Sequence, residues 1–213
     1  NRKEPMGLSP ERRPARACNV VAASGRASGR VTVMAHVDTK PGTPGAVDNA
    51  AGVVVLLLLA DLLSPARHGE LPVGLELLAV NGEDHFAAPG EVAWLAAQHD
   101  RLEDIALAVN IDGAGYHDGR SAFSTSNVDD DLAAHIATVM ARHDDLVPGP
   151  AWYQSDHSIF AMRGRPALAI TSERLEQLLA DVYHSPNDTP DKADARHIVA
   201  MSLALRDLIA EWP

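Results

Sequence analysis

Cysteine and aromatic residues are scarce in this chain of 213 residues. Cys18 is its one cysteine, so an internal disulfide bond and a metal site built from several thiolates are both excluded. Phe, Trp and Tyr together make up 4% of the residues, whereas 46% of the chain is hydrophobic. A folded core is therefore expected, and it must be built mainly from Val, Leu, Ile and Ala.

The chain also lacks an excess of basic residues and a long apolar run. The formal net charge of −11 argues against a surface that binds nucleic acid. The longest apolar run, residues 52–60, is far shorter than the about 20 residues that span a bilayer, so no membrane partner is expected. Residues 1–16, which are rich in Pro and Arg, are expected to be irregular.

Strand-like and helix-like segments alternate along the rest of the chain. Apolar segments with the length of strands are residues 18–23, 30–35, 73–80, 105–111 and 167–171. Segments with the length and periodicity of helices are residues 50–63, 91–99, 129–143 and 193–212. This alternation predicts an α/β three-layer sandwich, with a mixed, largely parallel central sheet flanked by helices. Residues 17–213 are expected to form a single domain, and we consider both a complete domain and one truncated at its N-terminus.

Side chains of the kinds that bind metals follow three of the predicted strands. His36, Asp112 and the pair Glu83-Asp84 each come directly after an apolar strand or a few residues later. Because ligands bind beyond the carboxyl ends of strands in open α/β sheets, these side chains are expected to meet at one rim. Alternation along an extended chain points His36 and Asp38 the same way, and a carboxylate beside an imidazole can fix its tautomer.

Two further candidates lie outside the strands. Asp48 precedes the predicted helix at residues 50–63, where an aspartate can also serve as an ordinary N-cap. His184 lies in a polar loop ahead of the last helix, where a histidine is usually just solvated, and Asp188 is placed to orient its ring. Each motif alone has an ordinary structural explanation, and their combination is what favours a metal centre.

In combination, these motifs resemble the co-catalytic dinuclear zinc aminopeptidase family, which includes bacterial leucyl aminopeptidases and aminopeptidase Y. The matching motifs are Ala35-His36-Val37-Asp38-Thr39, residues 45–52, Asn81-Gly82-Glu83-Asp84, Asn110-Ile111-Asp112-Gly113, residues 155–160 and residues 183–189. Their order and spacing agree from about residue 17 to the end of the chain. The family often has Glu-Glu where this chain has Glu83-Asp84, so the second cation is expected to sit differently or to bind more weakly.

The resemblance implies a role for each motif residue. His36 and Asp112 would hold one zinc ion, and Asp84 and His184 would hold the other. Asp48 would bridge both ions. Asp38 would support His36, and Glu83 would be the general base rather than a ligand. The residues expected near the substrate pocket are Asp156, His157, Phe160 and Tyr183.

The implied activity is that of a zinc-dependent aminopeptidase acting on peptides with a free N-terminus. Two Zn2+ ions, for which Co2+ or Mn2+ can substitute, would share one water molecule, and Glu83 would take its proton. The alternatives on this scaffold are a glutaminyl cyclase with one zinc ion, a carboxypeptidase, and a domain that keeps the fold without catalysis. The presence of all five ligand residues favours two metal ions.

Other residues of interest match no motif. The remaining histidines, including His85, are expected not to bind metal, and Trp152 is expected to pack in the core. The single cysteine and the lack of a recognisable signal peptide favour the cytoplasm over export. The preferred N-terminal residue and the oligomeric state do not follow from the sequence.

Overall fold

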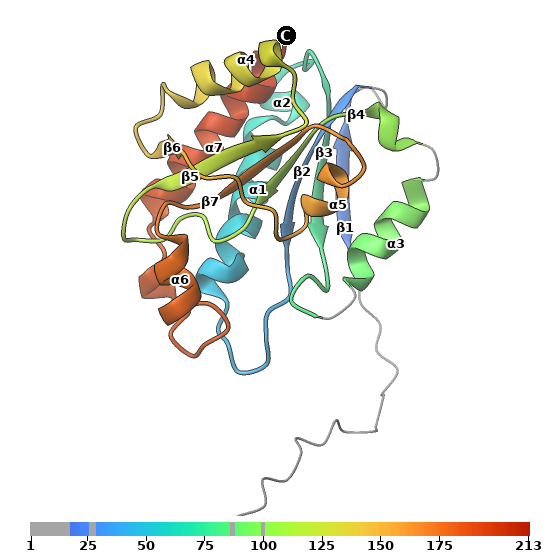
Figure 1. The fold of residues 1–213 in the computed structure, drawn as a ribbon. Coiled ribbons are helices and arrows are strands. Elements are labelled where there is room, and N and C mark those ends of the chain that lie inside the picture. The colour runs from blue at the N-terminus through green and yellow to red at the C-terminus, as the bar shows by residue number, and fades with distance from the viewer. Residues whose placement is uncertain (1–17, 26–28, 86–87, 99–100) are drawn as a thin grey trace, which may run out of the picture.

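The computed structural model describes residues 18–25, 29–85, 88–98 and 101–213 (Figure 1). The segment 1–16, which was expected to be irregular, and residue 99, the expected end of one helix, lie outside these ranges. Within the described residues, seven strands form one sheet in the order β1-β3-β2-β4-β7-β5-β6. The strands are β1 (Val20–Ser24), β2 (Arg30–His36), β3 (Gly74–Val80), β4 (Ile105–Ile111), β5 (Ser121–Ser126), β6 (Leu146–Pro148) and β7 (Ala167–Ser172).

The centre of the sheet is parallel. β3, β2, β4 and β7 are neighbours that run in the same direction, so their carboxyl ends meet at one edge. β1 is antiparallel to β3, β5 is antiparallel to β7, and β6 is parallel to β5. The predicted mixed, largely parallel sheet is therefore confirmed.

Helices cover both faces of the sheet and complete the predicted three layers (Figure 1). One face carries α1 (Ala51–Leu62), α2 (Pro65–His68), α4 (Asp130–Met140) and α7 (Ala195–Ala210), and the other carries α3 (Pro89–Gln98) and α5 (Ser158–Ala161). The remaining helical segments are α6 (Leu175–Asp181), η1 (Ala46–Ala50), η2 (Arg101–Asp104) and η3 (Pro190–Lys192). None of the helices in the described ranges is long and apolar enough to cross a membrane.

Strand β2 lies between two hydrophobic clusters and is buried at every position. Val31, Val33 and Ala35 pack in the cluster that contains α1 and α7. Met34 points the other way and packs in the cluster that contains Trp94 and Phe160. A strand buried on both faces reads as a continuous apolar run, which is why its sequence predicted it well.

Several short elements were not predicted from the sequence, among them β5, β6 and α6. Residues 121–126 have the sequence SAFSTS, and their hydroxyl side chains hide the apolar pattern of a strand. β6 contains only three residues, which is too short for any periodicity. α6 contains seven residues and buries only Leu178. The predicted helices were found, although each begins or ends one to three residues from its predicted limit.

Candidate metal centre

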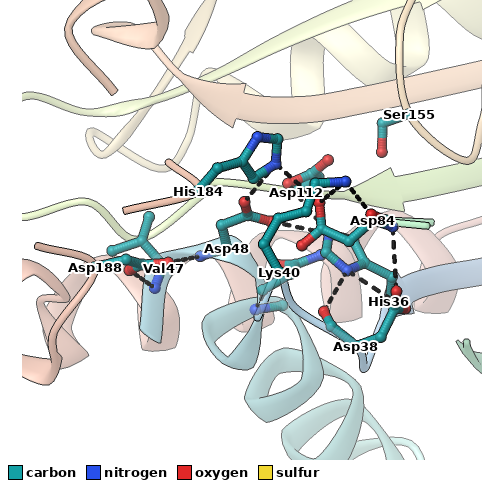
Figure 2. A network of polar contacts seen from close by, with 12 residues as sticks. His36, Asp38, Lys40, Val47, Asp48, Asp84, Asp112, Ser155, His184 and Asp188 are labelled. Carbon is teal, nitrogen blue, oxygen red and sulfur yellow. Dashed lines mark hydrogen bonds and ion pairs between the residues drawn. The ribbon is translucent and has the colours of Figure 1, made fainter. Parts of the chain in front are cut away.

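The parallel strands bring three of the predicted ligands to one rim, as expected from the sequence (Figure 2). His36 ends β2, Asp112 follows β4, and Asp84 lies in the turn after β3. β2 pairs with both β3 and β4, so the ends of these strands are neighbours. All three side chains are buried, which is unusual for ionisable groups that lack a partner.

Asp48 lies between the two predicted histidine ligands. Its Oδ1 atom is 3.1 Å from Nε2 of His36, and its Oδ2 atom is 3.4 Å from Nε2 of His184. Nε2 of His184 is 2.8 Å from Oδ1 of Asp84, and Nε2 of His36 is 3.7 Å from Oδ1 of Asp112. The structure therefore brings all five predicted ligands together. The Asp48 carboxylate lies between the pair of His36 and Asp112 and the pair of His184 and Asp84.

The segment that carries Asp48 is not an ordinary helix start, so the N-cap alternative is wrong. The N-cap residue of α1 is Ala50, and Asp48 lies two residues before it with φ −115° and ψ 81°. The Asn49 side chain donates to the carbonyl of Ile111 at 2.7 Å and accepts from the amide of Gly52 at 3.2 Å. A Cβ atom at Gly52 would lie 2.4 Å from Oδ1 of Asn49, so this close approach requires glycine.

Asp188 does not orient the ring of His184, contrary to the expectation from its position in the motif. Its Oδ1 atom accepts from the amide of Val47 at 2.7 Å, and its Oδ2 atom accepts from the amide of Asp48 at 3.1 Å. The amide of Ala46 donates to the Asp188 carbonyl at 3.2 Å. Asp188 thus joins the loop that carries His184 to the loop that carries Asp48.

The substitution Asp188→Asn is expected to destabilise the protein. An amide side chain has one acceptor oxygen, so one of the buried amides of Val47 and Asp48 would face an NH2 group. We expect the free energy of unfolding to fall by about 1–3 kcal/mol, measured by chemical denaturation of the metal-free protein. Asp191→Asn, at an exposed position nearby, is the matched control. Equal stability of Asp188→Asn and the wild type would contradict this role.

Asp38 supports the centre in a different way from that expected. Nδ1 of His36 lies 3.0 Å from the main-chain carbonyl of Asp38 and 3.9 Å from its carboxylate. Donation from Nδ1 to this carbonyl leaves Nε2 unprotonated, so that it can face Asp48 and Asp112 as a metal ligand would. The Asp38 carboxylate instead accepts from the amides of Gly82 at 2.5 Å and Asp84 at 3.2 Å, and it lies 2.9 Å from Nδ1 of His85. Asp38 therefore also holds the turn that contains Glu83, and His85 is a partner that sequence analysis missed.

The five predicted ligand residues, called the cluster below, have the unsatisfied atoms expected of a metal centre: His36, Asp48, Asp84, Asp112 and His184. Four buried atoms of the predicted ligand residues make no hydrogen bond to the described residues: Nε2 of His36, Oδ2 of Asp48, Oδ2 of Asp84 and Oδ1 of Asp112. His36, Asp48 and Asp84 each offer a ligand atom, and these atoms lie within 4.8 Å of one another. Buried carboxylates without a compensating charge are costly, so this donor set of oxygen and imidazole nitrogen fits divalent cations such as zinc.

The electrostatics of the cluster are strongly perturbed. Burial lowers the pKa of His36, but its contacts with Asp112 and Asp48 outweigh burial and raise that pKa well above its usual value. Burial raises the pKa of Asp48, and the charge of Asp112 acts in the same direction. Burial opposes ionisation of Asp112 too, yet its contact with His36 keeps the pKa of Asp112 below the usual value. Such shifts are typical of functional sites.

Glu83 faces a small cavity of about 90 Å³ beside the cluster. Burial, followed by the charge of Asp112, raises the pKa of Glu83 to about 7. The cavity is lined by Asp48, Glu83, Asp112, Trp152, Gln154, Ser155, Leu175, Leu179, Tyr183 and His184. Trp152 therefore lines the cavity, although it was expected to pack in the core. Glu83 is thus partly buried, close to a neutral pKa, and in the same cavity as the cluster.

Tyr183 lies in this cavity, as its position in the motif suggested. A Cβ atom at Gly113 would lie 1.4 Å from its hydroxyl oxygen, so only glycine at this position leaves room for the ring. The hydroxyl group is buried and has no hydrogen-bond partner among the described residues. Burial and the charges of Asp112 and Asp48 raise the pKa of Tyr183 well above its usual value, so the hydroxyl keeps its proton.

The other three residues expected near the pocket are not among those that line the cavity. Phe160 is buried in the core, with its ring centroid 5.4 Å from that of Trp94. Asp156 is fully buried, and burial together with the carboxyl group of Glu91 raises the pKa of Asp156 well above its usual value. Nε2 of His157 lies 2.8 Å from the carbonyl of Trp152. None of these three lines the cavity, and a role for them near the substrate stays a prediction.

Comparisons with solved structures agree on the fold. A zinc aminopeptidase from Bacillus subtilis matches with a TM-score of 0.74 and 19% identity, over 91% of this chain and 49% of that protein. An aminopeptidase from Aneurinibacillus sp. strain AM-1 matches with a TM-score of 0.71 and 23% identity, over 90% and 47%. A glutaminyl cyclase from Porphyromonas gingivalis matches with a TM-score of 0.73 and 22% identity, over 92% and 76%. The chain thus spans about half the length of these aminopeptidases.

Sequence comparison identifies the family. No match was found among curated proteins. The sequence profile of peptidase family M28 matches residues 19–209, which is most of the chain and includes every motif discussed above. This chain therefore belongs to peptidase family M28, which confirms the resemblance to zinc aminopeptidases that its motifs indicated.

Proposed function

We propose that this protein is a zinc-dependent aminopeptidase with two cations. His36 and Asp112 would hold one cation, and Asp84 and His184 would hold the other. Asp48 would bridge the two cations. Co2+ or Mn2+ are expected to substitute for zinc, because the donors are imidazole nitrogen and carboxylate oxygen without sulfur.

The observation that carries this proposal is the placement of the Asp48 carboxylate. Its two oxygen atoms face two different histidines, His36 at 3.1 Å and His184 at 3.4 Å. Each histidine also lies near a second carboxylate, Asp112 for His36 and Asp84 for His184. Two sets of donors that share one carboxylate are what a pair of closely spaced cations requires.

The residues around the cluster suggest how hydrolysis would proceed. Bound cations would act as Lewis acids, which increase the acidity of water and stabilise negative charge on the scissile carbonyl oxygen. Glu83 is placed to accept a proton from the attacking water and then to donate it to the leaving amine. The Tyr183 hydroxyl, which keeps its proton and faces the same cavity, is placed to donate a hydrogen bond to the developing oxyanion.

The size and charge of the cavity favour action at a free N-terminus. The cavity, of about 90 Å³, is much smaller than the roughly 300–1,000 Å³ of typical ligand sites, so it suits one small terminal residue better than a long peptide. Its wall contains the carboxylates of Asp48, Glu83 and Asp112, which would attract an ammonium group. Trp152, Leu175 and Leu179 add apolar surface for a side chain. We therefore infer that the substrates are peptides with an unblocked N-terminus.

The experiment that tests this function compares blocked and unblocked substrates. We expect a panel of aminoacyl-p-nitroanilides to be hydrolysed, with activity lost in the presence of a chelator and restored by zinc. Matched peptides blocked at the N-terminus should resist hydrolysis, and peptides blocked at the C-terminus should be cleaved. The reverse pattern would identify a carboxypeptidase, and no hydrolysis of either set by zinc-loaded protein would point to a domain without catalysis.

A glutaminyl cyclase is the second candidate, and Lys40 is the observation that favours it. The Lys40 ammonium group contacts Asp84, so it places a positive charge beside one of the two proposed cations. A structural match to a glutaminyl cyclase over 76% of that protein is compatible with this alternative. Cyclisation of peptides with N-terminal Gln, together with one zinc ion per chain, would favour the cyclase over the aminopeptidase.

A further inference from the structure

Lys40 lies in the loop after β2 and reaches the proposed metal centre with its side chain (Figure 2). Its Nζ atom is 3.5 Å from Oδ1 of Asp84 and donates a hydrogen bond to the main-chain carbonyl of Asp84. Among the ion pairs between described residues, this pair is the one that brings a Lys or Arg side chain to the cluster. The family motifs assign no role to this position.

The Lys40 ammonium group and His184 approach the same carboxylate oxygen. Oδ1 of Asp84 lies 2.8 Å from Nε2 of His184 and 3.5 Å from Nζ of Lys40. A zinc ion bound to this oxygen at about 2.0–2.2 Å would therefore lie within about 6 Å of the ammonium nitrogen. A single and a double positive charge at that separation repel each other strongly where the surroundings are partly buried.

The side chain of Lys40 is able to leave without a rearrangement of the backbone. The Lys40 carbonyl accepts from the amide of Thr43 at 3.0 Å, which closes a turn and fixes the start of the side chain. The side chain itself is 34% exposed, whereas that of Asp84 is 2% exposed. The long aliphatic stem therefore gives the ammonium group access both to the buried carboxylate and to solvent.

We propose that Lys40 is a tethered cation that competes with the second metal ion for Asp84. This inference rests on the proposed two-cation centre. In the metal-free protein, the ammonium group compensates the buried Asp84 charge. When a cation binds between Asp84 and His184, the ammonium group turns toward solvent. The two metal sites therefore differ in affinity, and the site of His36 and Asp112 fills first.

The test is a zinc titration of metal-free protein against a chromophoric chelator, which reports both affinities without any assay of activity. We expect the wild type to bind two zinc ions with unequal affinity. Lys40→Met should tighten the weaker site about tenfold, a change of about 1.4 kcal/mol in binding free energy, and leave the tighter site unchanged. Lys40→Arg keeps the charge and should resemble the wild type.

Lys192→Met is the matched control. The side chain of Lys192 is 33% exposed, close to the 34% of Lys40. Its Nζ atom lies 3.7 Å from Oδ2 of Asp191, which is outside the cluster. The Lys192→Met protein should bind zinc at both sites with the affinities of the wild type. Melting curves of the metal-free proteins provide a second measurement, since Lys40→Met should melt lower without zinc and show a larger upward shift with zinc.

The outcomes separate this proposal from the proposed function. Two sites with the same affinities in Lys40→Met and the wild type would overturn the role of Lys40 and leave the two-cation centre intact. One zinc site in the wild type and two in Lys40→Met would support competition between Lys40 and zinc for Asp84. The same result would contradict the proposal that the wild type holds two cations. One site in both proteins would overturn both proposals.

Discussion

The variant Glu83→Gln is expected to lose almost all turnover while keeping its metal ions. Glutamine has the size of glutamate but does not accept a proton at neutral pH, and Glu83 is not among the proposed ligands. Loss of a general base typically lowers turnover by about 10²–10⁴-fold, so we expect a decrease of this size in kcat for an aminoacyl-p-nitroanilide. KM should change little, because the side chain keeps its volume in the cavity.

Metal content and melting temperature decide how this result is interpreted. Glu83→Gln should bind as much zinc as the wild type and should melt at a similar temperature. Glu103→Gln, which changes an exposed glutamate in η2, should keep full activity. More than a tenth of the wild-type kcat in Glu83→Gln would exclude this residue as the base, and lost zinc with lost activity would make it a ligand.

The variant Asp48→Asn is expected to lose both metal ions and all measurable activity. The carboxylate faces His36 and His184. Asparagine replaces one of its oxygen atoms by an NH2 group and leaves the other as a neutral amide oxygen, so both proposed sites lose a charged donor. The remaining pairs would each hold a cation through one histidine and one carboxylate, which is below the coordination number of zinc in stable sites. Elemental analysis after dialysis should find no bound zinc.

Thermal melting gives an independent measure of the same loss. A ligand that binds only the folded state raises the melting temperature, so zinc should stabilise the wild type. Asp48→Asn should show no such shift, whereas Asp61→Asn, which removes an exposed carboxylate, should shift like the wild type. Two tightly bound zinc ions in Asp48→Asn would refute the bridging role.

Most of the central sheet was predictable because its strands are apolar on both faces. β2, β3 and β4 each appear in the sequence as a mainly apolar segment rich in Val, Leu, Ile and Ala, with few polar residues inside it. β5 was missed for the opposite reason. It lies near the edge of the sheet, three of its six residues are only partly buried, and its sequence is rich in Ser and Thr.

The positions of the proposed ligands at strand ends were predictable from topology alone. Parallel neighbours place their carboxyl ends together, so His36, Asp84 and Asp112 had to approach one another once the α/β class was known. The contacts of Asp188 were not predictable in this way. Its partners are the amides of Val47 and Asp48, about 140 positions earlier, and no local pattern identifies a carboxylate that binds a distant backbone segment.

Residues of the cavity wall and of the loops were the hardest to predict. Trp152 and Lys40 lie in irregular segments, where side-chain direction depends on the path of the backbone rather than on periodicity. Their neighbours in the sequence gave a partial signal, since Lys40 follows the motif of His36 and Trp152 precedes the motif of Ser155. Such positions become visible only when the surrounding loops are placed in three dimensions.

The wide separation of the proposed ligands along the chain has a consequence for biosynthesis. His36 is among the first described residues to leave the ribosome, and His184 is made only after β7 and α6. A nascent chain that ends before this loop holds at most an incomplete set of donors, and Asp188 has not yet joined the loop of Asp48. The complete centre forms only when nearly the whole sheet has been synthesised, so cation capture follows folding and cannot direct its early steps.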